Sequence, residues 1–307
     1  MFNRFYIYVF LLCFPFSSHA LQISQPLVDT DWLEQHQDEI IILDIRAKVK
    51  NYTEIGHIPN AVLIEWKKIR ANKQVGNVLL EKLVPNKDDF AAFMESKGVS
   101  NDSTVVITSQ GKNSSDMTMA TRLYWTMKYF GFDNMAILNG GTDKWIADGH
   151  SITKELTIPP QKGSFKIEYE RTELLATTAD IEQAISNQEM QIIDTRSLNF
   201  YLGLTIKPYV YKKGHIPTAK NFPHEMITYW KAPAVMMDIQ EIQTSLDALG
   251  VDAQKPSIAY CNSGHLATGA WFILSELLNN KNARLYDGSM HEWTKDPNRQ
   301  TVMMKVE

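Results

Sequence analysis

The sequence has little net charge, little cysteine and, beyond its first twenty residues, no long apolar run. A formal net charge of −4, with no basic stripe of interleaved aromatic residues, gives no sign of a nucleic-acid partner. No stretch after residue 20 approaches the roughly 18 apolar residues that suggest a transmembrane helix, so we expect no membrane partner for the mature chain. A length of 307 residues is enough for two ordinary domains.

The N-terminus differs from the rest of the chain. A weakly basic start over residues 1–4 precedes an apolar run over residues 5–16, and Ser18-His19-Ala20 ends it with small residues at both positions that determine cleavage. This pattern predicts a secretory signal peptide over residues 1–20. The protein would then be exported, to the periplasm of a Gram-negative bacterium and otherwise to the medium. A membrane anchor is the alternative, but the apolar run is short for a bilayer.

Cysteine is scarce, and one of the two cysteines, Cys13, lies inside the predicted signal peptide. The mature chain would keep Cys261 alone, so an intramolecular disulfide is excluded. A lone thiol in an oxidising compartment is a liability unless it has a task. A buried core cysteine is the plain alternative. The placement of Cys261 at the end of a predicted strand, before a polar loop, argues against that alternative.

Cys261 connects this predicted strand to a predicted helix. The apolar run 257–260 precedes it, and Leu266, Ala270 and Ile273 then recur at helical spacing. The unpaired amide groups at the start of such a helix favour negative charge. We therefore expect Cys261 to act as a thiolate nucleophile.

Short apolar segments alternate with amphipathic ones, which predicts an α/β fold with largely parallel sheets. In the first half the predicted strands cover residues 40–44, 62–64, 104–108 and 136–138. One predicted helix starts with Thr30 or Asp31 as its N-cap, and the others cover residues 87–97, 117–130 and 143–148. Strands this apolar are typical of sheets that helices cover on both faces.

The pattern of the first half recurs about 150 residues later, which indicates an internal duplication. Four pairs of segments match in order: Asp44-Ile-Arg46 with Asp194-Thr-Arg196, 56–61 with 214–219, 105–108 with 257–260, and 138–141 with 285–288, the last pair followed by Trp145 and Trp293. After the signal peptide we predict a first domain over residues 21–150, a linker over residues 151–169 and a second domain over residues 170–307.

The two halves differ at the cysteine, because Cys261 aligns with Ser109. The first-half loop after Ser109 is polar but has no thiol. One half would therefore carry the chemistry. The other would be catalytically silent and would support a site at the interface between the domains.

These motifs together resemble the rhodanese family in its two-domain form, over about residues 27–296. The resemblance implies two tandem rhodanese-like domains, each a mostly parallel sheet flanked by helices, with the first domain silent. It implies a sulfurtransferase in which Cys261 takes a sulfane sulfur from a small anionic donor, of the thiosulfate or 3-mercaptopyruvate type. The resulting persulfide would pass its sulfur to cyanide, a thiol or a protein acceptor, in ping-pong fashion.

The resemblance also implies the residues that bind the sulfur. The backbone of the loop after Cys261 would direct amide groups at the sulfur, as an anion-binding nest does. This loop consists of Asn262, Ser263, Gly264, His265, Leu266 and Ala267. Neither a metal nor an organic cofactor is implied.

The sequence departs from the family where the donor would bind. Phe200 stands where the family carries a second arginine for anionic donors, and the loop after Cys261 lacks the cationic pair of thiosulfate-preferring members. The identity of the donor is therefore open. Three lysines of the segment 204–213 are candidates for the missing charge, although a solvated loop lysine is the favoured interpretation of each: Lys207, Lys212 and Lys213.

Other functions that use a loop cysteine can be compared with the sequence. A phosphatase with a loop cysteine needs an arginine six residues later, where this chain has Ala267. A Cys–His hydrolase lacks a residue to orient His265. A non-catalytic persulfide carrier or sulfur-sensing protein remains the alternative to an enzyme.

Several side chains of the duplicated motifs are expected to be structural. The Asp-x-Arg pairs and the repeated turn histidines occur in both halves, including the half without a thiol: Asp44, Arg46, Asp194, Arg196, His57 and His215. Trp230 and Trp293 are expected to pack against their surroundings. His265 has no first-half counterpart, so it would either polarise the donor or stabilise the thiolate, unless it is a solvent-facing loop residue.

Overall fold

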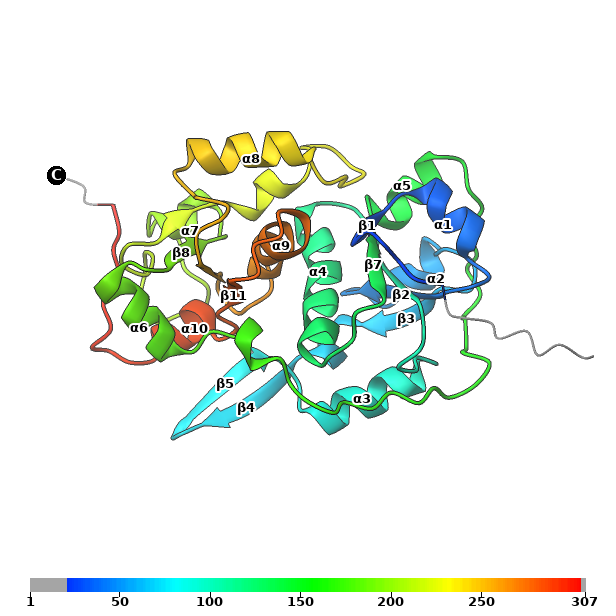
Figure 1. The fold of residues 1–307 in the computed structure, drawn as a ribbon, viewed down its shortest axis with the longest axis horizontal. Helices are drawn as coiled ribbons and strands as arrows, with labels where there is room; N and C mark the ends of the chain where they lie inside the picture. The colour runs from blue at the N-terminus through cyan, green and yellow to red at the C-terminus, as the bar shows by residue number, and fades with distance from the viewer. Residues whose placement is uncertain (1–20, 305–307) are drawn as a thin grey trace, which may run out of the picture.

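The computed structural model describes residues 21–304, and the predicted signal peptide lies outside the described residues. Two parallel sheets form the two halves, so the predicted α/β fold is confirmed (Figure 1). The first sheet has the order β1-β7-β6-β2-β3, with β1 Leu27–Val28, β2 Ile41–Arg46, β3 Val62–Glu65, β6 Val105–Ser109 and β7 Met135–Leu138. The second has the order β11-β10-β8-β9, with β8 Gln191–Asp194, β9 Lys220–Asn221, β10 Ser257–Tyr260 and β11 Ala283–Leu285.

Helices cover both sheets. Those of the first half are α1 Thr30–His36, α2 Asn51–Glu54, α3 Lys87–Ser96, α4 Ser114–Tyr129 and α5 Gly141–Ala147. Those of the second are α6 Thr178–Asn187, α7 Leu198–Tyr201, α8 Ile239–Ala248, α9 Ala267–Phe272 and α10 Ser289–Trp293. Helix α4 begins three residues before the predicted start at Met117, because the Asn113 side chain caps it by accepting from the Asp116 amide at 3.1 Å. Among the described residues no helix combines the length and apolarity needed to cross a bilayer.

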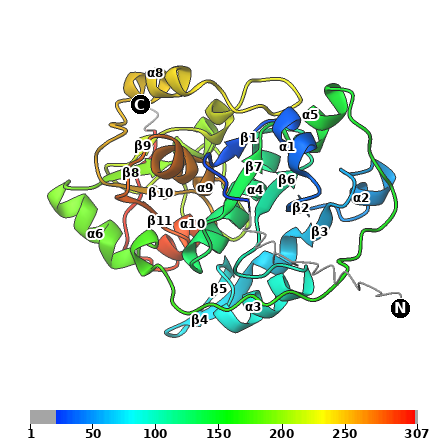
Figure 2. The same cartoon turned by 45° about the vertical axis from the view of Figure 1, so that its right-hand side comes forward.

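A helix follows Cys261 as predicted, but it is not a regular α-helix along its whole length. It is α-helical over α9 and becomes a π-helix over residues 273–277. Helices α9 and α4 lie side by side at the centre of the molecule (Figures 1 and 2). Thr121 of α4 and Thr268 of α9 join across this contact at 2.8 Å, and the ring of Tyr124 meets Phe272 edge-on. Because both helices are buried between the two sheets, their polar residues bond to each other rather than to water.

Corresponding strands pair in the same way in the two sheets, so equivalent residues of the two domains can be identified from the pairing. Asp44 pairs with Thr108, and Asp194 pairs with Tyr260, so the next residues, Ser109 and Cys261, occupy the same place in the two domains. The final repeat needs a correction of one residue. Ile107 pairs with Ile137, and Ala259 pairs with Leu285, so Leu285 corresponds to Ile137 rather than to Leu138.

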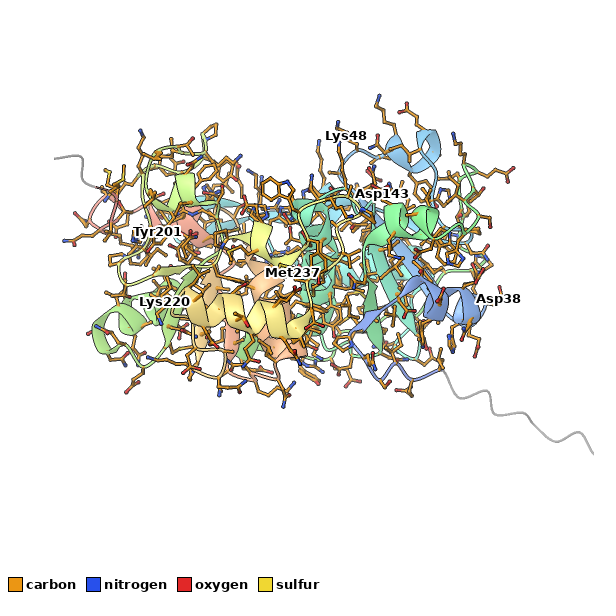
Figure 3. All side chains as sticks on the ribbon, turned by 90° about the horizontal axis from the view of Figure 1, so that it is seen from above. Asp38, Lys48, Asp143, Tyr201, Lys220 and Met237 are labelled. Carbon is orange, nitrogen blue, oxygen red and sulfur yellow. The ribbon has the colours of Figure 1, made fainter. Side chains whose placement is uncertain are left out.

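The segment predicted as a linker contains no helix or strand and lies against the first domain. Thr153 exchanges backbone hydrogen bonds with His57 at 2.9 Å, and the ring of Phe165 is buried against Phe90 and Phe132. The chain then passes along α3 toward the second domain (Figures 1 and 2). Figure 3 shows the molecule from above, with Asp38 and Asp143 on the first domain and Lys220 on the second.

The hairpin that contacts the second domain was not predicted from the sequence. Residues 71–83 form it as two antiparallel strands, β4 Ala71–Val75 and β5 Val78–Leu83. It leaves the first domain after β3 and extends beneath α10 of the second domain (Figure 1). Its polar residues, such as Lys73 and Lys82, interrupt the alternation that identifies a half-buried strand.

Candidate active site

Each Asp-x-Arg motif forms a buried ion pair that holds the following turn. Arg46 Nε donates to Asp44 at 2.6 Å, and Arg196 Nη2 donates to Asp194 at 2.5 Å. Arg196 also donates to the carbonyl of Gly214 at 2.8 Å, the first residue of the repeated turn. The pairs are buried in both domains, including the domain without a thiol, which agrees with the structural interpretation.

The repeated turn histidines are also held by local contacts. The ring of His57 stacks on Tyr52, and the ring of His215 stacks on Tyr201. Each histidine Nδ1 lies within 2.9 Å of the carbonyl of its tyrosine partner. Burial lowers the pKa of both histidines below the ordinary value of 6.5, so neutral rings are favoured.

Cys261 lies directly after β10, and 1% of its surface is exposed. The hydroxyl of Ser289, at the start of α10, holds its loop: it accepts from the amides of Cys261 and Gly264, each at 3.0 Å, and donates to the carbonyl of Tyr286 at 2.8 Å. Two further amides of α10 donate to the carbonyls of Cys261 and Asn262. The register places Gly141 where the second domain has Ser289, so the first-domain loop lacks both the thiol and this hydroxyl.

The loop directs one amide at the sulfur. Ser263 N lies 3.5 Å from Cys261 Sγ, whereas the amide of Gly264 is turned to Ser289 instead. The side-chain carbonyl oxygen of Asn262 is buried without a hydrogen-bond partner in the described part of the chain. A buried acceptor of this kind carries a free-energy cost until a donor reaches it, so the site has one unmet polar group beside the thiol.

Gly264 is required by its backbone and its neighbours. Its φ of +67° lies in the left-handed region that favours glycine, and a Cβ there would collide with the carboxylate of Asp287. Leu266 is half-buried against the main core, and Ala267 is fully buried as the first residue of α9.

His265 turns into the interface between the domains rather than to solvent. Its Nε2 lies 3.2 Å from the carbonyl of Ser115 and 3.1 Å from the hydroxyl of Thr118, both on α4, and its ring lies against Trp66. Burial and the charge of Arg70 lower the pKa of His265 well below its ordinary value. A neutral imidazole in these contacts ties the reactive loop to the first domain.

The first domain supplies a cation that the sequence did not reveal. Arg70 follows the 3₁₀ turn η1 (Trp66–Ile69), and its Nη2 donates to the carbonyl of Ser263 at 3.0 Å and to its hydroxyl at 3.1 Å. Burial lowers the pKa of Arg70 to about 10, so the guanidinium stays charged at neutral pH. No pattern in the sequence linked residue 70 to residue 263.

A second buried arginine from the first domain braces the loop. Arg122 of α4 donates to the carbonyl of Gly264 at 2.8 Å and forms an ion pair with Asp287. The other oxygen of Asp287 accepts from the amide of Val84 at 2.6 Å. Asp287 thereby joins α4, the hairpin segment and the reactive loop.

The hairpin covers the loop from the other side. The amide of Glu81 donates to His291 Nε2 at 3.1 Å, while His291 Nδ1 contacts the carbonyl of Tyr209 at 2.7 Å. The ammonium of Lys82 lies 3.3 Å from the centre of the Tyr209 ring. These contacts and those of Arg70 place the site between the two domains, as predicted.

The lysines considered as a replacement for the arginine missing at Phe200 lie at or near the surface, which agrees with the favoured interpretation of solvated loop residues. Lys207 Nζ lies 5.4 Å from the Phe200 ring, and Lys212 Nζ donates to the carbonyl of Arg299 at 2.6 Å. Trp293 is buried as predicted, whereas Trp230 is 96% exposed, so the packing role predicted for Trp230 is wrong. Trp230 belongs to an exposed loop and borders a small cavity of about 150 Å³.

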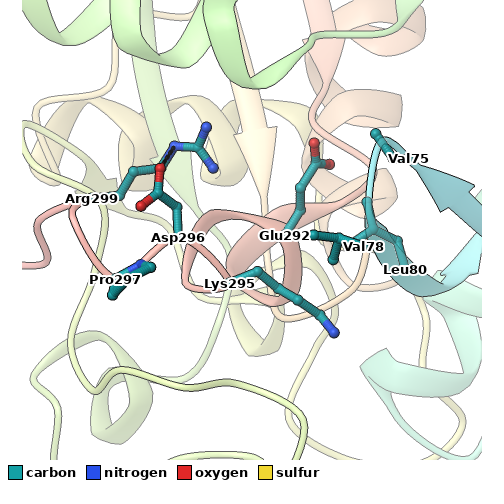
Figure 4. Close-up of a pocket in the computed structure, with 8 residues that line it drawn as sticks. All are labelled: Val75, Val78, Leu80, Glu292, Lys295, Asp296, Pro297 and Arg299. Carbon is teal, nitrogen blue, oxygen red and sulfur yellow. Dashed lines mark ion pairs between the residues drawn. The ribbon is translucent and has the colours of Figure 1, made fainter.

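The main cavities in the described part of the chain are not lined by Cys261. A cavity of about 380 Å³ lies between the hairpin and the C-terminal segment, and Glu292, Lys295 and Arg299 form its polar wall (Figure 4). Its remaining lining residues are Val75, Val78, Leu80, Asp296 and Pro297. Within the described residues no group of three His, Cys, Asp or Glu side chains is placed to hold a metal ion.

Comparisons with known proteins agree with this arrangement. The family model of the rhodanese-like domain matches residues 29–148 and again residues 177–296. The chain is 31% identical to the sulfur carrier protein TtuD of Thermus thermophilus over 284 residues, which covers 87% of this chain and 93% of that protein. It is 29% identical to the thiosulfate sulfurtransferase of Bos taurus over 254 residues, covering 81% and 80% of the two chains.

Solved structures show the same fold. SseA from Escherichia coli, described as a 3-mercaptopyruvate sulfotransferase, superposes with a TM-score of 0.73 at 24% identity, covering 87% of this chain and 99% of that chain. The anaerobic ergothioneine biosynthesis enzyme from Chlorobium limicola gives a TM-score of 0.77 at 20% identity, covering 92% of this chain and 71% of that one. Fold and site thus define a tandem α/β protein with a single loop thiol. The chain belongs to the rhodanese family and is a rhodanese-type sulfurtransferase.

Proposed function

We propose that the protein moves a sulfane sulfur from a small anionic donor to a thiophilic acceptor through a persulfide on Cys261. With thiosulfate, the Cys261 thiolate attacks the outer sulfur, the S–S bond of the donor breaks, and sulfite leaves with the electron pair. An acceptor thiolate or cyanide then attacks the terminal sulfur of the persulfide and leaves as a persulfide or thiocyanate. The Cys261 thiolate is regenerated, so the cycle needs no external oxidant or reductant.

The observation that carries this proposal is a single thiol on a fixed loop beside a partly buried cation, Arg70. Cys261 is the free cysteine of the described residues, and the amide of Ser263 faces its sulfur. A loop held by Ser289 does not need to reorganise when charge develops on the sulfur. The first domain has Ser109 at the matching place and is therefore proposed to be silent.

The donor class rests on the charge beside the thiol and on the printed names of relatives. Arg70 offers a guanidinium at Ser263, two residues from Cys261. Relatives are described as acting on thiosulfate, and a structural neighbour is described as acting on 3-mercaptopyruvate. Both donors are small and anionic, which suits the partly buried guanidinium of Arg70. The acceptor would be a thiol, cyanide or a protein, and neither a metal nor an organic cofactor takes part.

Intact-mass spectrometry tests the persulfide directly. The purified protein should gain the mass of one sulfur after incubation with thiosulfate or 3-mercaptopyruvate, and cyanide or a thiol should remove it. The variant Cys261→Ser should gain nothing and should keep the thermal stability of the parent, because the two side chains are similar in size. A donor panel that never loads Cys261 would refute the proposal, and a large loss of stability in Cys261→Ser would favour a core cysteine.

A persulfide carrier is the second candidate, because one relative is described as a sulfur carrier protein and Cys261 is 1% exposed. A carrier would load the sulfur but would not turn over with small acceptors. Steady-state thiocyanate production from thiosulfate and cyanide distinguishes the two: multiple turnovers support the enzyme, and a single sulfur released per chain supports the carrier.

We also propose that the protein is exported after cleavage behind Ala20, because residues 1–20 have the composition of a signal peptide. N-terminal sequencing of the protein from its native source should begin at Leu21. A mature protein that retains Met1 would contradict this.

A further inference from the structure

We propose that Arg70 of the first domain is the residue that binds the donor anion and sets the preference for donors that carry a negative group next to the transferable sulfur. This inference rests on the proposed function, since it names the recognition element of the same site. It gives the first domain a direct part in the reaction, because the specificity residue and the thiol then come from different domains.

The first argument is that the second domain lacks a cation for this task at the positions expected to provide one. Phe200 replaces the expected arginine, and the ammonium of Lys212 donates to the carbonyl of Arg299. Lys207 is exposed beside the Phe200 ring and, within the described residues, makes no hydrogen bond to the reactive loop. Arg196, although close enough for its charge to interact with Cys261, is committed to Asp194 and Gly214. The charge on the reactive loop therefore arrives from outside its own domain.

The second argument is the electrostatic balance around Arg70. The nearby charged groups include two cations, Arg122 and Lys82, and one carboxylate, Asp287. The carboxylate of Asp287 is engaged by Arg122 and by the amide of Val84. Within the described residues Arg70 forms no hydrogen bond to a carboxylate, and its hydrogen bonds run to neutral oxygens of Ser263 and Lys82. A partly buried guanidinium without an anionic partner favours the arrival of an anion.

The third argument is that Arg70 is held in place before any donor arrives. Its guanidinium carbon lies 4.8 Å from the centre of the Trp66 ring, and its Nε donates to the carbonyl of Lys82 at 3.2 Å. Lys82 has a φ of +69°, a left-handed conformation that non-glycine residues rarely adopt. The side chain of Asn72 accepts from the Lys82 amide at 3.3 Å and supports this conformation. Strain of this kind concentrates at functional sites.

The chemistry of the donor suits this position. A guanidinium presents paired N–H groups that match two oxygens of a sulfonate or carboxylate. Thiosulfate carries three such oxygens on the sulfur next to the transferable one. Because Arg70 is held against Ser263, its guanidinium would bind the oxygens of thiosulfate while Cys261 attacks the neighbouring sulfur. The same guanidinium would stabilise the negative charge on the departing sulfite. A donor without such oxygens next to its transferable sulfur would gain nothing from Arg70.

The test compares two donors in single-turnover loading of Cys261, followed by intact mass. Thiosulfate is the donor with anionic oxygens next to the transferable sulfur, and the persulfide of N-acetylcysteamine is the donor without them, which leaves as its thiol. Arg70→Gln should slow loading from thiosulfate by about 10- to 100-fold, the usual range for a lost charge-assisted hydrogen bond. It should change loading from the N-acetylcysteamine persulfide, which has no oxygens for Arg70 to hold, by less than about threefold. Arg70→Lys, which keeps the charge but not the fork, should lie between Arg70→Gln and the parent with thiosulfate.

Lys68→Gln, an exposed cation on the same turn, is the matched control and should load like the parent from both donors. Equal slowing of both donors in Arg70→Gln would overturn the inference, because it would show a structural role alone, as would no slowing of either. If Arg70→Gln does not fold, the same criterion applies to Arg70→Lys. Failure of the parent to load from any donor refutes the proposed function itself, whereas parent loading that is insensitive to Arg70 refutes this inference alone.

Discussion

Ser289 gives the sharpest test of how the reactive loop is held. Its hydroxyl is fully buried and takes part in three hydrogen bonds, two of which satisfy the amides of Cys261 and Gly264. The variant Ser289→Ala removes the acceptor for both amides and leaves them buried. Because it leaves Cys261 and Arg70 in place, the variant probes the loop rather than the chemistry.

The expected loss of stability follows from the cost of unpaired buried donors. Each such group costs about 1–3 kcal/mol, and a water molecule that enters the vacated space would recover part of this cost. We therefore expect Ser289→Ala to lower the free energy of unfolding by about 2–4 kcal/mol. Loading of Cys261 should slow by about tenfold or more, because a loosened loop no longer holds the sulfur in line with the donor.

A second substitution separates the effect of the Ser289 hydroxyl from the effect of its backbone conformation. Ser289 has a φ of +53°, and the first domain has Gly141 at the same place. Ser289→Gly loses the same hydrogen bonds but relieves the left-handed strain, so it should be more stable than Ser289→Ala by about 0.5–1 kcal/mol. Urea denaturation of the three proteins measures both differences. A value for Ser289→Ala within about 0.5 kcal/mol of the parent would refute the role of the hydroxyl, and a Gly variant less stable than the Ala variant would refute the strain.

Two further predictions concern the contacts between the domains. Asp287→Asn should lower the free energy of unfolding by about 3–5 kcal/mol, because it leaves Arg122 buried without an ionised partner, while the exposed control Asp133→Asn should cost about 1 kcal/mol or less; equal urea midpoints would contradict this. Burial lowers the pKa of His291 below 6.5, and the neutral Nε2 of His291 accepts from the amide of Glu81. The stability that this neutral, buried histidine contributes is present above about pH 6.5 and is lost as the pH falls through the folded-state pKa. The loss of stability from about pH 7 to pH 5 should therefore be smaller in His291→Gln than in the parent. An equal pH dependence of stability in the two proteins would argue against a pH-sensitive contact between the hairpin and His291.

The fold could be predicted well from the sequence because its signals are local. Strands such as β6 and β10 are short, contain no charged residue and are buried at every position, so their burial on both faces is visible in the composition of the 5 and 4 residues that form them. The Asp-x-Arg motifs and the repeated turns recur in order, which revealed the duplication. The one-residue error at Leu138 arose where the repeat contains two similar apolar residues, Ile137 and Leu138, and pairing with the neighbouring strand was needed to choose between them.

The hairpin and the exposed tryptophan were harder to predict for physical reasons. The strands of β4–β5 are stabilised by contacts with the second domain, so their own sequence does not need a regular alternation. Trp230 is apolar enough to suggest packing, but its exposure depends on where the neighbouring loop lies. Composition alone does not specify either arrangement.

The sequence by itself determined that one thiol stands between a buried strand and a helix, in the second of two related halves. It did so because residues adjacent in the chain share an element, and because Cys261 is the only cysteine after residue 20 of the sequence. Only the tertiary structure decided what surrounds that thiol. Arg70, Arg122 and Ser289 reach the loop from positions far along the chain, and burial between the domains keeps the His265 ring neutral against α4. Such contacts depend on how two sheets and two central helices pack, and no local pattern encodes them.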